Sequence, residues 1–311
     1  MTINSNLFNP IPLFESKDEW YKNKQTYKGK SSPTIAPCNY ILPMQLTINK
    51  AMYEALTSTD SNIKILFRLI SHDDKKSYSL NKTEVLRNID LLPTEIQSDD
   101  MYASVYMGGR WIVSHDIPIG TYYLMMSYGN MNDISANKAW YSDLFTFRAD
   151  TSELIHIKYR NSEPIIVGDN YMPFAEDSSK VYMDVWLDAE VMNNEFIFED
   201  TVTAMDGYDR VEKRISYKKY QVVFLATEYM AEALRLLWHC DTVAIDIRGR
   251  ARKVDNVNME VAWEQDNHFA KVTLKFKTDT VAQTNAIAVT YDDTKHGDFN
   301  EDFNEDFGIE K

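Results

Sequence analysis

Residues 219–279 constrain the fold more than any other part of the chain, because they combine one helical period with strict strand alternation. Within this region, residues 227–239 place apolar side chains at the i, i+3, i+4 and i+7 spacing of a helix with one buried face. Those side chains belong to Met230, Ala233, Leu234 and Leu237. Thr227 is suited to cap the helix, and Glu228 places a negative charge in its first turn. The pattern predicts one amphipathic helix over 227–239.

Three segments after this helix alternate between apolar and polar residues: 243–247, 257–263 and 270–276. Because successive side chains of a strand point to opposite faces, each segment predicts a strand with one buried face and one polar face. The short basic run 248–253 between the first two predicts a solvated hairpin turn rather than a nucleic-acid patch. We therefore expect a β domain over 151–291 that carries one amphipathic helix.

Residues 39–150 contain several short strand-like runs separated by turn residues. In the clearest run, 63–69, four apolar residues fall on one face at the strand period of two. Gly108 and Gly109 predict a hairpin between two other runs. Short strands at this spacing are typical of an immunoglobulin-like β-sandwich. The expected fold is mainly β, with two β-sandwich-like domains, of which the first is immunoglobulin-like and the second carries the helix.

Two further segments lack clear helix or strand periodicity. Residues 1–38 contain several prolines around a polar stretch, which predicts an extended N-terminal arm. Trp20 and Tyr21 are its candidate anchors onto a domain or a neighbouring subunit. Residues 188–214 are acidic and irregular, so we expect a long connection there or an excursion toward a partner.

The chain is acidic, with a formal net charge of −14. Residues 292–311 contribute −6 of this charge, because they hold eight acidic residues and two lysines. The same segment repeats the sequence DFNE, which predicts a disordered acidic tail with regularly spaced aromatic contact residues. These contact residues are Phe299, Phe303 and Phe307. Since phosphate contacts need clustered Lys and Arg, we expect no nucleic-acid partner.

Motifs for catalysis, cofactors and membranes are absent from the sequence. It has neither a G-x-S-x-G nucleophile elbow nor a phosphate-binding glycine loop, and His239 and Cys240 lack further ligands at metal-binding spacing. No run is long enough to span a bilayer, and the first residues lack the basic and apolar regions of a signal peptide. Two distant cysteines, Cys38 and Cys240, favour synthesis in a reducing cytoplasm. We expect no enzyme, no cofactor, no metal and no membrane partner.

Tryptophans are the candidate contact residues of the two domains. Trp186, Trp238 and Trp263 fall within patterned segments, so we expect them to pack in the core. Trp111 and Trp140 flank turns, so of the tryptophans they are the fairer candidates for an exposed surface. A carbohydrate platform at Trp111 and Trp140 would be one use of such a surface.

Six segments carry a resemblance to a known family. They are NPIPLF (9–14), YILPMQL (40–46), PIGTYYL (118–124), WYSDLFTF (140–147), FLATEYMAEALRLLWHCDTVAI (224–245) and VAWEQDNHFAKVTLKFKTDTV (261–281). Their order and spacing resemble a protein family encoded by tailed phages and prophages of Bacteroidales, although the DFNE repeats and His268 depart from that family. The resemblance implies a structural protein of the virion or its tail region, and it implies no catalytic residues.

The residues and the resemblance together predict a structural component of a tailed bacteriophage virion. We expect a ring-forming subunit of the neck, tail or baseplate that acts through protein–protein interfaces, because long arms with aromatic anchors suit subunits that interlock around an axis. Its expected partners are other virion proteins and further copies of itself, and its expected location is the virion after synthesis in the host cytoplasm. Two alternatives stay open: a peripheral receptor- or glycan-binding module, and a tail-associated hydrolase with two carboxylates in a cleft.

Overall fold

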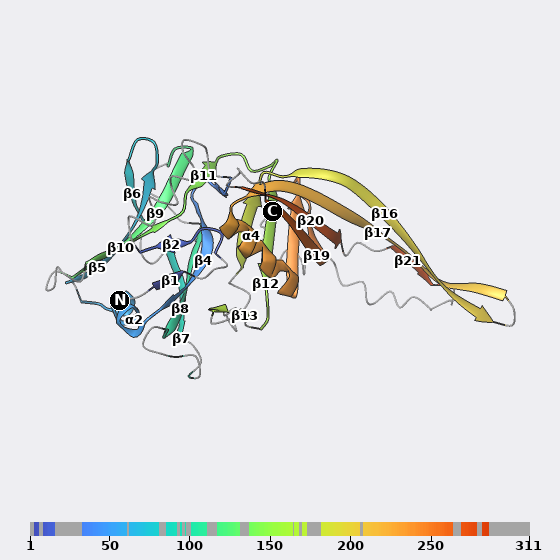
Figure 1. The fold of residues 1–311 in the computed structure, drawn as a ribbon, viewed down its shortest axis with the longest axis horizontal. Coiled ribbons are helices and arrows are strands. Elements are labelled where there is room, and N and C mark those ends of the chain that lie inside the picture. The colour runs from blue at the N-terminus through green and yellow to red at the C-terminus, as the bar shows by residue number, and fades with distance from the viewer. Residues whose placement is uncertain are drawn as a thin grey trace, which may run out of the picture.

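The structure is a computed structural model, and in the part that it describes the protein is mainly β with two short α-helices. The described residues are 3–5, 9–15, 33–60, 62–80, 85–91, 94, 97, 101–110, 117–130, 137–163, 165–167, 170–172, 182–205, 208–263, 269–278 and 282–285. Their strands form a large mixed sheet, a four-stranded sheet and a two-stranded sheet. Figure 1 shows a broad body from which one long ribbon of two strands extends. The expectation of a mainly β fold is confirmed.

The four-stranded sheet shares a hydrophobic cluster with one part of the large sheet. The four strands are, in sheet order, β1 (Ile3–Ser5), β4 (Tyr40–Ile48), β8 (Ala103–Arg110) and β7 (Leu86–Leu91). The strands of the large sheet in this half are β2 (Leu13–Phe14), β3 (Ile35–Pro37), β5 (Ile63–Ser71), β6 (Ser77–Leu80), β9 (Gly120–Asn130), β10 (Lys138–Ser142) and β11 (Phe145–Arg148). The predicted strand 63–69 corresponds to β5, where Ile65, Phe67 and Leu69 are buried. An immunoglobulin-like order of strands is not confirmed.

The described pieces of the predicted arm are extended, but they belong to the body. Strands β1 and β2 pair with β4 and β10, and β3 pairs in parallel with β11. A helix that the sequence reasoning missed, α2 (Lys50–Thr57), follows β4 and is capped by the side chain of Asn49, which accepts from the amide of Met52 at 3.0 Å.

Gly108 and Gly109 do not form the predicted hairpin, because both lie inside strand β8. Their φ angles are +115° and +95°, which residues with a side chain rarely adopt. The partner strand β4 has an irregular register between Ile41 and Met44, where Pro43 interrupts the ladder. A Cβ on Gly108 would lie 2.7 Å from the Cα of Pro43. The two glycines therefore permit a close approach of β8 to the bulge in β4.

The second half of the large sheet is covered by the predicted helix. Helix α4 (Glu228–Arg235) continues into the 3₁₀ turn η2 (Leu236–His239), so the expected helix over 227–239 is confirmed with a tighter last turn. Its four predicted apolar side chains are buried. Thr227 is the N-cap, since its hydroxyl accepts from the amide of Met230 at 3.1 Å. The helix packs on a hydrophobic cluster that holds the alternate residues of the underlying strands.

Each predicted strand segment of this half is present, and the spatial order of the strands differs from their order in the chain. They are β12 (Ile155–Arg160), β15 (Met183–Leu187), β16 (Glu190–Met205), β17 (Tyr208–Ala226), β18 (Thr242–Ile247), β19 (Ala251–Trp263), β20 (Ala270–Thr278) and β21 (Ala282–Asn285). The small two-stranded sheet consists of β13 (Ile165–Val167) and β14 (Asn170–Met172). The basic run predicted as a turn joins β18 to β19, and Arg248 and Gly249 take positive φ there.

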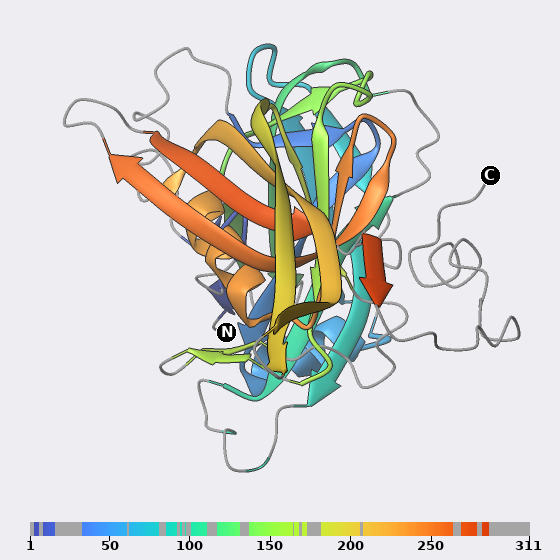
Figure 2. The ribbon, with the colours of Figure 1, turned by 90° about the vertical axis from the view of Figure 1, so that its right-hand side faces the viewer.

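The expectation of an irregular connection over 188–214 is wrong. Residues in this stretch form β16 and the first part of β17, which pair as a long antiparallel ribbon. Strand β20 pairs with β17 only from Lys219 to Ala226, and β21 pairs with it from Lys213 to Ser216. Figure 2 looks at the molecule from the ribbon end, with the β19–β20 hairpin projecting to one side above the helix. Both faces of the ribbon are exposed to solvent, so neither face has to be apolar. Its sequence therefore lacks the alternation of apolar and polar residues that marks a half-buried strand.

Candidate functional site

Most of the predicted contact residues lie outside the described residues. They are Trp20, Tyr21, Trp111, Phe299, Phe303 and Phe307. Trp140 is described, and the structure rules it out as a candidate for an exposed surface: it lies in β10 and its side chain is 0% exposed in the first hydrophobic cluster. Proximity to a turn does not decide which face of a strand a side chain takes, and Trp140 takes the inner one. The expected carbohydrate platform therefore loses one of its two tryptophans.

Only one of the three tryptophans that were expected in the core is buried. Trp186 is buried, whereas Trp238 is 68% exposed and Trp263 is 52% exposed, so the expectation is wrong for those two. Trp238 lies in η2, where the tighter 3₁₀ turn rotates it off the buried face of α4. Trp263 ends β19 opposite Ala270, on the same face as the buried residues, but the helix does not cover it. Both tryptophans are thus available for contacts.

The ribbon exposes two phenylalanines on one face. Phe196 is 64% exposed and Phe198 is 76% exposed, and their spacing of two residues along β16 places them on the same side. The ammonium of Lys218, directly across from Phe196, lies 5.4 Å from that ring's centroid. Sequence reasoning missed both residues, although two phenylalanines spaced two residues apart would share one face of a strand. They form the most exposed aromatic pair among the residues with described side chains.

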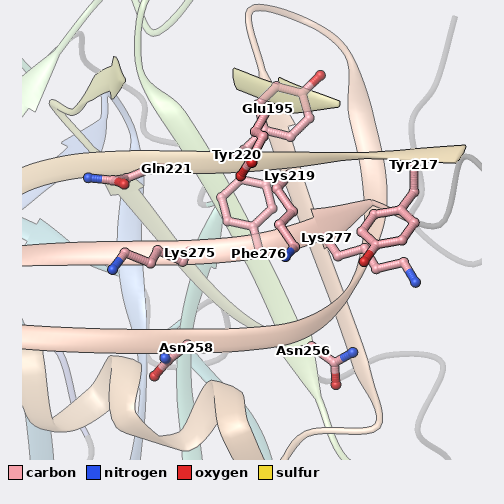
Figure 3. Close-up of a pocket in the computed structure, with 10 residues that line it drawn as sticks. All are labelled: Glu195, Tyr217, Lys219, Tyr220, Gln221, Asn256, Asn258, Lys275, Phe276 and Lys277. Atoms are coloured by element: carbon pink, nitrogen blue, oxygen red, sulfur yellow. The ribbon is translucent and has the colours of Figure 1, made fainter. Parts of the chain in front are cut away.

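A pocket of about 450 Å³ opens where the ribbon joins the sheet of β17, β20 and β19. Figure 3 shows the residues that line it, which come from these three strands and from β16. Its lysines are Lys219, Lys275 and Lys277, and one acidic residue, Glu195, is also in the lining. Lys219 lies directly opposite Lys277, which places both side chains on one face of the sheet. We call this feature the lysine pocket.

Tyr217 organises the cations of the lysine pocket. The ammonium of Lys277 lies 3.7 Å from its ring centroid, and that of Lys219 lies 5.9 Å from it. The Tyr217 hydroxyl donates to Glu199 Oε1 at 2.6 Å, and this hydrogen bond raises the pKa of the phenol, with smaller contributions from desolvation and nearby negative charge. Tyr217 is therefore a neutral phenol at neutral pH, and its ring attracts both ammonium groups.

The third lysine of the pocket has a partner of its own. Lys275 Nζ lies 2.6 Å from Glu260 Oε1, and both groups are exposed. Asp255 lies opposite Lys277 on β19, and Glu195 lies opposite Lys219 on β16. The lining itself still holds three cations and one anion in a chain with a formal net charge of −14. The pocket thus brings three lysines together, and a carboxylate of a neighbouring strand pairs with or lies opposite each of them.

A second polar cluster lies at the joint between the two hydrophobic clusters. His156 Nε2 is 2.9 Å from Asp184 Oδ1, and the Tyr40 hydroxyl donates to the other oxygen of this carboxylate. The His156 ring stacks on Trp186, with centroids 4.1 Å apart and planes 7° apart. Trp186 in turn pairs with Ile35 of β3, the contact that makes the large sheet continuous. The cluster ties β4, β12 and β15 together, which is a structural role.

The two cysteines have raised thiol pKa values. Both are free thiols, and burial raises the pKa of Cys240 to about 12, with a smaller contribution from the charge of Asp241. Burial also raises the pKa of Cys38. Thiolates are the reactive and ligating form, so burial lowers the fraction of that form at both cysteines. Among the described residues no group of three or more His, Cys, Asp or Glu side chains could hold a metal ion.

No protein-family model, curated protein or solved structure matches this chain. Neither described helix has the length and apolar character needed to cross a membrane. The described surface carries three features open to solvent: the ribbon with Phe196 and Phe198, the exposed Trp238 and Trp263, and the lysine pocket.

Proposed function

We propose that this chain is a structural subunit of a tailed bacteriophage virion, part of a ring in the neck, tail or baseplate. It acts through protein–protein interfaces with other virion proteins and with further copies of itself. The proposal combines the sequence resemblance to a structural family of tailed phages with one structural observation, the projecting ribbon of β16 and β17 (Figure 1).

The ribbon supports the proposal because its exposed groups would be satisfied in an assembly. Phe196 and Phe198 lie on one face, where contact with a neighbour would bury large apolar area. Strand β16 ends the sheet in the described part of the chain, so its outer edge offers backbone donors and acceptors to an added strand. A long ribbon that reaches away from its own body suits subunits that interlock in a ring.

In this proposal each domain has its own part in the assembly. The body over 39–150 is an immunoglobulin-like sandwich that acts as a rigid support, and the unit over 151–291 carries the ribbon. Residues 1–38 with Trp20 and Tyr21 add a second contact to a neighbouring subunit, and chemistry plays no part in this function. The chain is made in the host cytoplasm and ends in the virion.

The proposal is tested first by mass spectrometry of purified particles of the phage or induced prophage that encodes this chain. We expect the chain at the stoichiometry of a ring component, and its absence from purified particles would sink the idea. A second test replaces the ribbon aromatics in the double variant Phe196→Ser and Phe198→Ser, which should lower incorporation into particles about tenfold or more, since hot-spot aromatics at interfaces contribute about 2 kcal/mol or more each.

Leu66→Ser provides the matched control, because Leu66 is also an exposed apolar residue on a strand but lies in β5, away from the ribbon. Its incorporation should equal that of the unmodified chain. Equal loss in the control and in the ribbon variant, at equal thermal stability, would show that the ribbon is not the assembly surface.

A further inference from the structure

We propose that the lysine pocket is the binding site of the acidic, phenylalanine-bearing segment 298–307 of the same chain. This segment lies outside the described residues, and the argument for it comes from the pocket, from the sequence of the segment and from its reach. The inference is independent of the function proposed above.

Lys219 and Lys277 bring two positive charges close together in the pocket, although Glu195 and Asp255 lie opposite them on the outer strands. Lys219 and Lys277 are direct cross-strand neighbours, and like charges at that position destabilise a sheet. Both ammonium groups approach the ring of Tyr217, which concentrates their positive charge at one place. Carboxylates between these lysines would relieve the repulsion and form charge-assisted hydrogen bonds.

The rest of the lining suits a peptide rather than a lone ion. The amides of Gln221 and Asn258 can donate to and accept from a peptide backbone, and the volume of about 450 Å³ exceeds what a single anion needs. The ring of Tyr217 offers an aromatic wall for an edge-to-face contact with a phenylalanine. The preferred ligand is therefore an extended peptide that alternates acidic and aromatic residues.

Segment 298–307 has this composition. It reads DFNEDFNEDF, with five acidic residues, three phenylalanines and no lysine or arginine. The repeat of four residues presents an aspartate before each phenylalanine, so successive repeats would present the same pair of groups to the pocket. Its negative charge complements the three lysines of the pocket, whereas the acidic remainder of the surface repels it.

The segment can reach the pocket within one chain. Strand β21 ends at Asn285, opposite Lys213, and Lys219 lies six positions further along β17, roughly 20 Å along a strand. The thirteen residues from Asn285 to residue 298 span up to roughly 45 Å when extended. A tether of that length gives an effective concentration on the order of millimolar, which favours the pocket of the same chain over that of a neighbour.

Zero-length carbodiimide cross-linking of the full chain, followed by peptide mass spectrometry, tests the proposal. We expect carboxylates of 298–307 to link to Lys219, Lys275 and Lys277 about tenfold more often than to Lys50 and Lys64, which are exposed controls on the other half of the molecule. In an equal mixture of ¹⁵N-labelled and unlabelled chains, the cross-linked pairs should be isotopically unmixed. Salt at 1 M should reduce the yield, because it screens exposed charges.

Two variants sharpen the test without touching the hydrophobic clusters. Lys219→Gln with Lys277→Gln should lower the remaining links to Lys275 about tenfold, and Phe299→Ala with Phe303→Ala and Phe307→Ala should lower links to all three lysines several-fold. Links spread evenly over pocket and control lysines would overturn the site. Mixed-isotope pairs at about half of all linked pairs, the statistical value for links between different chains, would overturn the assignment of the same chain as the source.

Discussion

Strand β17 contains two regions that differ in the burial of their side chains. From Tyr220 to Ala226 its alternate side chains are buried beneath α4, and Phe224 packs in the second hydrophobic cluster. From Lys213 to Lys219 the same strand belongs to the ribbon, where β16 and β21 flank it and most described side chains are at least partly exposed. One continuous strand thus changes from core to contact surface, and the change occurs where the cover of the helix ends.

In this sheet, whether an apolar side chain is buried or exposed depends on whether another part of the chain packs over it, and not on its residue type. Phe224 and Phe198 are both strand phenylalanines, yet one is buried and the other is among the most exposed apolar side chains described. Val261 and Trp263 show the same effect in β19, since they share a face with buried residues of β20 but extend past the helix. An uncovered apolar face on an otherwise well-packed sheet indicates a contact surface.

The largest effect is expected for Phe224→Ala in the covered region. Removal of this buried ring should lower the free energy of unfolding by about 3–5 kcal/mol, because the lost burial and the cavity both destabilise the fold. Phe198→Ala in the ribbon should change it by less than about 0.5 kcal/mol, as for other exposed sites. Urea unfolding followed by tryptophan fluorescence measures both, and equal losses would erase the distinction between the two regions.

A smaller effect is expected at the boundary itself, where β17 ends and the helix begins. Thr227→Ala removes the side-chain oxygen that accepts from the amide of Met230, which should destabilise the fold by about 1 kcal/mol. Thr227→Ser retains the acceptor, so it should lie within about 0.3 kcal/mol of the unmodified chain. The same unfolding experiment applies, and a serine variant as unstable as the alanine variant would argue against the cap.

Chemical labelling of cysteines compares the covered region with the ribbon without any change in the stability of the fold. Burial raises the pKa of Cys240 to about 12, so its thiolate at pH 8 should be roughly a thousandfold scarcer than that of an ordinary cysteine with a pKa of 9.0. A cysteine introduced in the ribbon by Phe198→Cys should react with iodoacetamide about a hundredfold faster, since the greater nucleophilicity of a high-pKa thiolate offsets part of the difference. Both thiols should react at similar rates in urea. Equal rates in the folded chain would show that the helix-covered region is open to solvent.

Sequence reasoning predicted the elements with strong local period and erred where long-range contacts decide. Helix 227–239, its cap at Thr227 and strand 63–69 follow from spacing alone, because they depend on neighbouring residues. Gly108 was assigned to a turn, since a glycine pair indicates backbone freedom but not whether a hairpin or a close strand contact uses it. The ribbon was missed because a strand without a buried face has no apolar alternation.

The candidate contact surfaces could be predicted only in part. Exposure of Trp238 depends on the tighter turn of η2, and exposure of Trp263 depends on how far the helix extends over β19. Trp140 became a core residue because the sheet of β9 and β10 packs that face inward. The lysine pocket required the pairing of β17 with β20, since only the register places Lys219 opposite Lys277.

By itself, the sequence determined the mainly β character, the one amphipathic helix, the strong negative charge and the acidic aromatic repeats, because period and composition are local properties. Only the tertiary structure decided which apolar faces are covered, that β16 and β17 leave the body as a ribbon, and that lysines distant in sequence line one pocket. The physical reason is that burial and charge clustering depend on strand register and helix placement, which join residues far apart along the chain.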